Sequence, residues 1–378
     1  MHGRDFVSRR PLVPMNHSFD TIIAGSGLAG SCAAFVLSEN EQVLILDAEQ
    51  PGCGASGVPV GLISPLMARR ARPVWRMEEA MQSFHHVLAE SKAVRHFSAS
   101  GVRKPARSEE QATEFRDASM KWPDHGRWFE PESAAERWPY LFTQFGVLEV
   151  TSGGAVSMPA FCQTLVRAAC DRGAESISAC AIQGWDDFGD QVTVQLSSNE
   201  EFTSRRLLLC LGEGYTEFSE LRALRLHPIK GQWIRLISPD NLPQTVAISS
   251  GSYLARDDKG IVVGSSYELK YSKIEPTEEV IKKLHREACL LIPSLRRSTV
   301  TDAGAGIRVT VPEIRLPMLG SLPGSHNVWI FTGLGAKGLL MAPLLAYELP
   351  KFFEKPSAIP KEISVNLHGS GHRTFYRE

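Results

Sequence analysis

The chain has 378 residues, with 41 Lys and Arg against 42 Asp and Glu, and its formal net charge at pH 7 is −1. A chain of this length is too long for one ordinary hydrophobic core, so we expect two domains. The balanced charge excludes a general electrostatic attraction to nucleic acid or to an anionic membrane, so any polyanion would need a local basic patch.

The cysteines and the apolar runs bound the class of protein further. The seven cysteines are dispersed and form no C-x-x-C pair, which argues against a disulfide framework or a zinc site and fits a reducing cytoplasm. Residues 1–17 hold no apolar run of signal-peptide length, and no later segment approaches the ~18 apolar residues of a membrane span. We therefore expect a cytoplasmic protein without a membrane partner, in which residues 1–17 are an N-terminal extension.

A strand, a glycine turn and a helix are predicted in direct succession near the start. The apolar residues 22–24 predict a buried strand, and the sequence GSGLAG leads from it into an apolar helix. Gly25 permits the tight turn, Gly27 lets the backbone approach a pyrophosphate, and Gly30 lets helix and strand pack closely. The residues predicted to contact a nucleotide here are Gly25, Gly27, Leu28, Ala29 and Gly30.

An acidic residue, Asp47, ends the next predicted strand, residues 43–46. A carboxylate at this place can bind the ribose hydroxyls of an adenosine, and it disfavours the 2′-phosphate of NADP. A strand-end cap is the alternative role for Asp47. The two strands, the helix and the acid together indicate a dinucleotide site, which NAD and FAD satisfy equally.

Two further segments favour FAD. The loop GCGASG at 52–57 offers backbone amides to a cofactor that extends beyond its ADP half, although it also reads as a plain surface loop. Residues 328–349 repeat the order strand, glycine turn and helix, and a second helix N-terminus can stabilise the negative charge of a reduced flavin. The predicted contacts in these two segments are Ala55, Ser56, Gly57, Gly333, Gly335, Ala336, Lys337, Gly338 and Leu339.

Five motifs in a fixed order resemble those of the D-amino-acid-oxidase-like superfamily of FAD-dependent amine oxidoreductases. Within it, the sequence most resembles the FAD module of the bifunctional tRNA 5-methylaminomethyl-2-thiouridine biosynthesis proteins. The motifs are GASGVPVGLISP (54–65), HPIKGQWIRL (227–236), VVGSSYE (262–268), GAGIRVTVPEIRLPMLG (304–320) and GLGAKGLLMAPLLAYEL (333–349).

The resemblance implies an α/β (α+β) fold, in which an antiparallel-sheet substrate domain is inserted into a Rossmann-like FAD-binding domain. The implied FAD-binding domain comprises residues 18–66, 151–225 and 304–351, and the substrate domain comprises residues 67–150 and 226–303. Residues 352–378 are then a C-terminal tail.

The resemblance also implies that the flavin takes a hydride from the carbon beside an amine. We expect Arg308 to bind the substrate carboxylate, because a guanidinium can do so with two parallel hydrogen bonds. Lys337 would supply positive charge near the pyrimidine ring or the substrate, which makes Arg308 and Lys337 the catalytic candidates, and Tyr253 and Tyr267 would line the substrate cavity. The alternatives are a surface charge for Arg308, a solvated lysine at a helix start, and ordinary core or surface tyrosines.

Two statements on other groups follow from residue types. Some members of the superfamily bind flavin covalently through a cysteine in the strand that follows the arginine, and residues 309–320 contain no cysteine, so we expect noncovalent FAD. The eleven histidines show no spacing typical of a metal site, so no metal is expected.

The implied substrate is a glycine-like or N-substituted amino acid moiety, which the bifunctional proteins find on a modified wobble uridine of tRNA. One local feature supports contact with RNA, the basic and aromatic segment MARRARPVWR at 67–76, although it also reads as a solvated helix face. Two other functions stay open: a free amino acid oxidase or dehydrogenase for glycine, sarcosine or a D-amino acid, and a flavin-binding interaction protein without turnover. The residues proposed to contact tRNA are Arg69, Arg70, Arg72 and Arg76.

Overall fold

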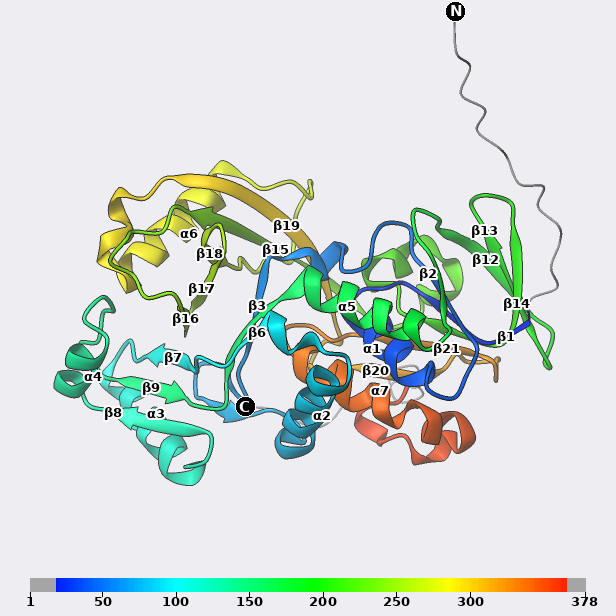
Figure 1. Ribbon diagram of the computed structural model, residues 1–378, viewed down its shortest axis with the longest axis horizontal. Helices are drawn as coiled ribbons and strands as arrows, with labels where there is room; N and C mark the ends of the chain where they lie inside the picture. Colours follow the sequence, from blue (N-terminus) through cyan, green and yellow to red (C-terminus); the bar gives the residue numbers. More distant parts are fainter. Residues whose placement is uncertain (1–17, 366–378) are drawn as a thin grey trace, which may run out of the picture.

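Two domains lie side by side in the computed structural model, which describes residues 18–365 (Figure 1). A Rossmann-like domain contains both predicted nucleotide turns, and a large-sheet domain contains the inserted strands. This arrangement confirms the mixed α/β fold class expected from the sequence. The predicted N-terminal extension, residues 1–17, lies outside the described residues, and so do residues 366–378 of the predicted tail.

The Rossmann-like domain is built on a sheet whose central strands are parallel. The parallel neighbours follow the order β11-β2-β1-β14-β21, while β13 and β12 continue antiparallel from the start of β14 and β20 pairs antiparallel with β21. Strands β1 and β2 are apolar and largely buried, as expected for parallel strands covered by helices. The bounds are β1 Ser18–Ala24, β2 Val43–Leu46, β11 Glu175–Ile177, β12 Ile182–Asp187, β13 Val192–Leu196, β14 Glu201–Leu209, β20 Met318–Ser321 and β21 Val328–Thr332.

Three helices pack together on this sheet (Figure 1). Helix α1, Leu28–Leu37, is buried at every position, because it lies against both α5, Met158–Asp171, and α7, Gly338–Glu354. A helix that is apolar on all sides needs such flanking partners. The packing holds the first turn of α1 and the first turn of α7 on the same side of the domain.

Helix α2, Met77–Glu90, differs from the expected domain division. Residues 67–150 were predicted to belong to the substrate domain, but α2 packs its apolar face against α7. Arg76 at its start also forms an ion pair of 2.9 Å with Glu348 of α7. Because an amphipathic helix buries its apolar face against another apolar surface, and α7 provides that surface, residues 77–90 pack on the Rossmann-like domain.

The large-sheet domain contains eight strands in the order β19-β15-β18-β17-β16-β7-β9-β8. All neighbours are antiparallel except β16 and β7, which are parallel. This departure from a purely antiparallel sheet arises because the sheet joins two separate chain segments, and no hairpin sets their relative direction. The bounds are β7 Val102–Pro105, β8 Gly126–Phe129, β9 Val147–Val150, β15 His227–Leu236, β16 Ala247–Ser250, β17 Ser252–Asp257, β18 Gly260–Gly264 and β19 Val300–Thr310.

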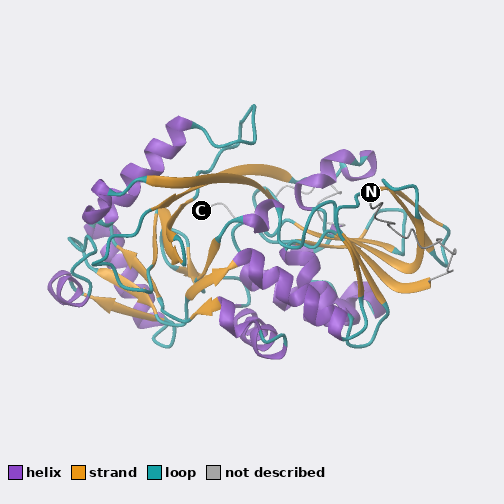
Figure 2. Cartoon of the chain, turned by 45° about the horizontal axis from the view of Figure 1, so that its top comes forward, coloured by secondary structure: helices purple, strands orange, loops and turns teal. Residues whose placement is uncertain are grey.

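Helix α6, Glu278–Leu291, covers one face of the large sheet through Leu284, Ala288 and Leu291, which recur at helical spacing. The long strands β15 and β19 reach from this sheet toward the Rossmann-like domain (Figure 1), and Figure 2 shows long, curved strands in the upper middle of the molecule. Two more helices accompany β8 and β9, namely α3 Glu109–Lys121 and α4 Pro131–Arg137.

Short strands carry the chain between the domains. A three-stranded sheet contains β3 Val60–Ile63, β6 Phe97–Ser98 and β10 Gly154–Ser157, and a small hairpin contains β4 Leu66–Met67 and β5 Arg72–Pro73. At the other end of the chain, Ile359, Ile363 and Val365 are buried, and Ser364 pairs with Leu319 of β20. Residues 352–365 of the predicted tail therefore pack on the Rossmann-like domain.

Candidate active site

A cavity of about 700 Å³ lies between the two domains. Both predicted nucleotide turns line it from the Rossmann-like side, and β15, β17, β18 and β19 line it from the large sheet. The two walls differ in chemistry, since the first is mostly backbone and small residues and the second presents cationic and aromatic side chains.

The first turn follows β1 and is too crowded for side chains. Gly25 has φ +99°, and a Cβ at this position would lie 2.4 Å from the carbonyl oxygen of Cys210. A Cβ at Gly30 would lie 1.8 Å from the carbonyl oxygen of Gly25. Gly25, Gly27, Leu28 and Ala29 line the cavity as expected, while Gly30 lies behind them and lets α1 approach the turn.

Asp47 reaches this turn from the end of β2 and also lines the cavity. Its Oδ2 accepts hydrogen bonds from the Ser26 backbone N–H at 2.5 Å and from the Ser26 hydroxyl at 2.6 Å, and its Oδ1 accepts one from the Glu49 backbone at 2.8 Å. Asp47 thus holds the turn in place, and its partly exposed carboxylate remains at the cavity wall. Both roles considered for it from the sequence are compatible with this geometry.

The small-residue loop after Asp47 folds over the first turn of α1. The Ser56 hydroxyl accepts a hydrogen bond of 3.0 Å from the Leu28 backbone N–H, and a Cβ at Gly27 would lie 3.3 Å from that hydroxyl oxygen. Ala55 and Ser56 line the cavity, and Gly57 does not. The loop therefore extends the backbone wall beyond the first turn, as a cofactor longer than its ADP half requires.

The second glycine turn brings another helix N-terminus to the same place. Gly333 has φ +74° and Gly335 has φ +55°, and a Cβ at Gly338 would lie 2.8 Å from Leu28 Cδ2 in the first turn of α1. The first turns of α1 and α7 are therefore neighbours, as the repeated motif suggested. The lining residues from this turn include Gly333, Gly335, Ala336, Gly338 and Leu339.

The side chain of Lys337 leaves the cavity. Its ammonium donates a hydrogen bond of 2.9 Å to the carbonyl oxygen of Arg315, and Lys337 is not among the lining residues. Burial, together with the charge of Arg315, lowers the pKa of Lys337. The structure brings its backbone to the turn, but it does not bring its charge to the cavity wall.

Arg308 and Tyr253 face the cavity from the large sheet. Arg308 has room because Gly231 lies beside it on β15, where a Cβ would be 3.0 Å from a guanidinium nitrogen. Burial lowers the pKa of Arg308, while Tyr253 and Tyr267 act in the opposite direction. The Tyr253 hydroxyl is buried without a hydrogen-bond partner among the described residues, and burial raises the pKa of this phenol. Tyr267 lines the same cavity but is 61% exposed, which places it at the mouth.

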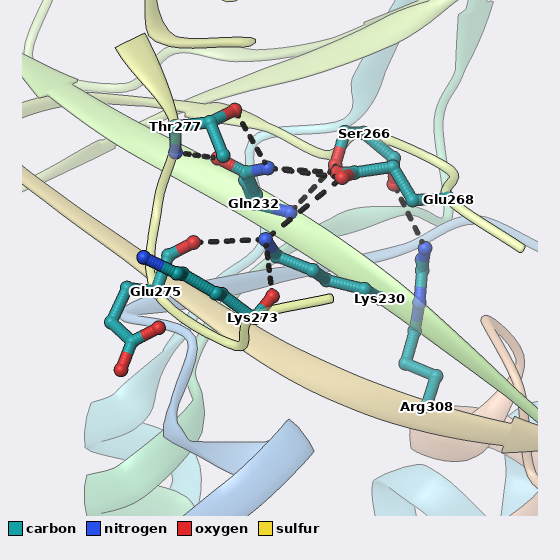
Figure 3. A network of polar contacts seen from close by, with 8 residues as sticks. All are labelled: Lys230, Gln232, Ser266, Glu268, Lys273, Glu275, Thr277 and Arg308. Carbon is teal, nitrogen blue, oxygen red and sulfur yellow. Dashed lines mark hydrogen bonds and ion pairs between the residues drawn. The ribbon is translucent and has the colours of Figure 1, made fainter. Parts of the chain in front are cut away.

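A buried polar network positions Arg308 (Figure 3). The guanidinium donates a hydrogen bond of 3.1 Å to the Ser266 carbonyl oxygen, and the hydroxyl of Ser266 bonds both the Gln232 backbone and Glu268. The Gln232 side-chain nitrogen donates a hydrogen bond of 2.9 Å to Glu268, and its amide oxygen accepts one of 2.7 Å from the Thr277 backbone N–H. Gln232 is fully buried, so these bonds have little competition from water.

Lys230 binds the other end of the segment that begins near Ser266. Its ammonium is 1% exposed and donates to the carbonyl oxygens of Lys273, at 2.9 Å, and Glu275, at 2.8 Å (Figure 3). Lys230 and Gln232, which both lie in the HPIKGQWIRL segment, thus fix the loop at 265–277 that carries Ser266. Lys230 and Gln232 are positioning residues for Arg308.

The four arginines proposed for RNA do not form one free basic patch. Arg70 forms an ion pair of 2.9 Å with Glu114, and Arg76 pairs with Glu348 at the same distance. Arg69 and Arg72 are exposed on the β4–β5 hairpin. This hairpin adjoins the cavity, because Met67 and Ala68 are among the lining residues.

Residues 18–365 contain neither a metal-binding cluster nor a membrane-spanning helix. No group of three or more His, Cys, Asp and Glu side chains in this range is placed to hold a metal ion. No helix in the same range is long and apolar enough to cross a membrane.

Sequence reasoning missed two lining residues with evident chemistry, Trp233 and Lys104. Trp233 lies in the HPIKGQWIRL motif and could have been found there. Lys104 has no local signal, because only the pairing of distant strands brings β7 to the cavity.

Comparisons with known proteins agree with this geometry. A family model described as DAO, FAD dependent oxidoreductase, matches residues 20–349. The bifunctional tRNA 5-methylaminomethyl-2-thiouridine biosynthesis protein MnmC of Maricaulis maris is 26% identical over 333 residues, which cover 86% of this chain and 50% of that protein. The glycine oxidase of Pseudomonas putida is 25% identical over 349 residues, covering 86% of this chain and 92% of that enzyme. The chain thus spans about half the length of that MnmC relative and most of the glycine oxidase.

Solved structures share the fold across nearly the whole chain. Glycine oxidase from Geobacillus kaustophilus superposes with a TM-score of 0.78 at 20% identity, covering 90% of this chain and 95% of that one. Iminodiacetate oxidase from Chelativorans sp. BNC1 gives a TM-score of 0.79 at 21% identity, covering 91% and 98%. Together with the two glycine turns, Asp47 and the family match over residues 20–349, this shows that the chain belongs to the DAO family of FAD-dependent oxidoreductases.

Proposed function

We propose that this enzyme oxidises the C–N bond of a glycine-like or N-substituted amino acid moiety. One observation carries the proposal: the half-buried guanidinium of Arg308 lies in the wall of the cavity that both nucleotide turns line. Its only hydrogen bond within residues 18–365 goes to the Ser266 carbonyl, and no carboxylate in that range forms an ion pair with it. A half-buried guanidinium with free donors in a cavity wall favours a ligand that brings a carboxylate.

We infer that FAD is bound noncovalently along the backbone wall. Gly25, Gly27 and Asp47 suit the ADP half, and the first turns of α1 and α7 suit the negative charges of the cofactor. FAD, when bound, accepts the two electrons that leave the substrate carbon beside the amine. Cys53 and Cys210 line the cavity, but burial raises the pKa of both thiols, which disfavours the reactive thiolate that a covalent link needs.

The side-chain wall would orient the substrate. Arg308 would bind the carboxylate, and the unpartnered hydroxyl of Tyr253 would donate a hydrogen bond to the same carboxylate, since its raised pKa keeps it protonated. The ring of Trp233 and the body of Tyr253 would exclude water from the reacting carbon. Gly264 leaves the space for Tyr253, because a Cβ there would lie 2.8 Å from its ring.

The test is anaerobic titration of the purified protein with glycine, sarcosine and a mixture of D-amino acids. The proposal expects the flavin absorbance to bleach with at least one of these amines. A flavin that no amine bleaches would favour an interaction protein without turnover. Bleaching by simple amines that lack a carboxylate, and by none of the amino acids, would contradict the role of Arg308.

A second candidate function is oxidation of the same moiety on tRNA. It is favoured by the β4–β5 hairpin, which presents Arg69 and Arg72 to solvent beside Met67 and Ala68 of the cavity wall. Phosphate contacts release counterions, so this candidate expects tRNA binding that weakens steeply with salt. It also expects weaker binding by the double variant Arg69→Ala and Arg72→Ala than by the control Arg70→Ala, because Arg70 already pairs with Glu114.

A further inference from the structure

A second cation is buried in the cavity wall at Lys104 of β7. Its side chain is 4% exposed, lines the cavity, and donates one hydrogen bond of 3.2 Å to the Ala68 carbonyl oxygen. No carboxylate within residues 18–365 forms an ion pair with it. The ammonium also lies 5.9 Å from the centre of the Phe115 ring, which is a cation–π contact. An ammonium has three donors, and no hydrogen bond to another of the described residues occupies the remaining two.

The strand register places Lys104 in line with the substrate side of the sheet. Arg103 pairs with Ile248 across the parallel junction of β7 and β16, so Lys104 lies beside Ser249 on the cavity face. Ser249 pairs in turn with Tyr253 of β17. The row of side chains on this face therefore leads from the proposed carboxylate site to Lys104.

A lysine at this position is costly without an anion. Burial lowers the pKa of Lys104 to about 8, so the side chain is still mostly charged at neutral pH. Removing an ammonium from water is costly unless a counter-charge and hydrogen bonds compensate, and one carbonyl oxygen and the face of one aromatic ring are incomplete compensation. A methionine would fill the same volume at lower cost, so the charge calls for a function.

We propose that Lys104 binds a second carboxylate of the substrate, carried on an arm attached to the amine nitrogen. The inference rests on the proposed function, because it takes Arg308 as the site of the first carboxylate. Ser249, half-buried beside Lys104, supplies a hydroxyl to the same group. The substrate is then an N-substituted amino acid with two anionic ends.

The two cations belong to strands that lie far apart in the large sheet, so the arm must bridge several strands. Strands β19 and β7 are separated by β15, β18, β17 and β16, which at ~4.8 Å per step would put them ~24 Å apart in a flat sheet. The arm length is therefore the variable that the probes must scan.

The test measures binding separately from turnover. The probes are thioethers in which sulfur replaces the amine, with a carboxymethyl group on one side and an arm of one to five methylene groups on the other. Each arm ends in a carboxylate or, in the matched probe, in an amide. We expect the FAD-loaded wild-type protein to bind at least one carboxylate probe about tenfold or more tightly than its amide partner in titration calorimetry.

Two variants and one control locate the effect. In Lys104→Met we expect the carboxylate-to-amide ratio to fall to within about twofold of one. Ser249→Asp keeps Lys104 but places a carboxylate beside it, and we expect the same loss of preference, so the test stands even if Lys104→Met folds poorly. Arg103→Met is the control, because it removes a neighbouring charge whose guanidinium lies toward Trp138, 5.9 Å from its ring centre.

The outcomes separate this inference from the proposed function. The second carboxylate site is refuted if no arm length gives a preference in the wild-type protein, if the preference survives in both Lys104→Met and Ser249→Asp, or if Arg103→Met abolishes it equally. Preference for a carboxylate arm without bleaching by any amine would overturn the proposed oxidation and retain the site. Bleaching by amino acids without a preference for a carboxylate arm would support the proposed oxidation and refute the second carboxylate site.

Discussion

The two walls of the cavity recognise their ligands in different ways. The Rossmann-like wall uses backbone groups and glycines, whose roles depend on the absence of side chains at Gly25 and Gly30. The wall from the large sheet presents the side chains of Arg308, Tyr253 and Lys104, and glycines on neighbouring strands leave space for the first two. The first wall therefore offers mainly backbone groups to a ligand, whereas the second offers charged and aromatic side chains.

The largest effect should come from breaking the backbone wall. Gly30→Val would place its Cβ 1.8 Å from the Gly25 carbonyl oxygen, so the glycine turn must move. We expect the variant to be purified without flavin, as judged by absorbance. Gly214→Ala is the matched control, because its Cβ would meet Leu211 at an ordinary 3.8 Å, and it should retain flavin. Full flavin content in Gly30→Val would show that the turn is not the cofactor site.

The side-chain wall should break without loss of the cofactor. Arg308→Met removes both hydrogen bonds expected to hold the substrate carboxylate, and charged hydrogen bonds contribute about 1.5–3 kcal/mol each. We expect kcat/KM for the amino acid to fall by about 100-fold or more, with flavin content retained. Lys337→Met should have a smaller effect, because its ammonium bonds the Arg315 carbonyl outside the cavity. An equal or larger loss in Lys337→Met would restore Lys337 as a catalytic candidate.

The lowered pKa of Lys104 should make the stability of the protein depend on pH. Its pKa of about 8 in the folded protein lies below the usual 10.5. Between these two pH values the unfolded chain therefore binds more protons than the folded one. As a result, the contribution of Lys104 to the free energy of unfolding rises with pH in this window. We expect Lys104→Met to be more stable than wild type at pH 7.5, and this advantage to shrink by ~2 kcal/mol at pH 9.5. Urea unfolding at both pH values measures it. A difference independent of pH would mean that Lys104 titrates normally.

The smallest effect should come from the network that positions Arg308. Gln232→Leu leaves Glu268 and the Thr277 backbone N–H without their buried partner. We expect KM for the amino acid to rise about tenfold with a smaller change in kcat, because Arg308 loses its orientation but not its charge. Thr277→Val removes only the 3.3 Å bond to the Gln232 amide and serves as the control. A fall in kcat alone would argue for a different role for Gln232.

The sequence predicted the backbone wall better than the side-chain wall, and the reason is physical. The turn at Gly25, the acid Asp47 and the turn at Gly333 each depend on residues adjacent in the chain, so their motifs carry the geometry. Gly30 and Gly57 are not among the residues that line the cavity. A sequence motif alone does not distinguish a glycine that lines the cavity from one that only allows close backbone packing.

The side-chain wall depends on which distant strands become neighbours. Lys104 reaches the cavity only because β7 pairs in parallel with β16, a junction that no hairpin dictates. The resemblance supplied Arg308, whereas the positioning role of Gln232 required the fold of the loop at 265–277. The contact of helix α2 with α7 had no local signal for the same reason, since α7 lies near the other end of the chain.

The most direct test of the division between the two walls compares glycine or sarcosine with the corresponding amide, which keeps the amine and the reacting C–H but lacks the carboxylate. The measurement is the rate of anaerobic flavin bleaching in the wild-type protein and in Arg308→Met. We predict that the free acid reduces the flavin about 100-fold faster than the amide in wild type and that Arg308→Met erases this difference. Equal rates for acid and amide in the wild-type protein would contradict recognition of the substrate carboxylate by the side-chain wall.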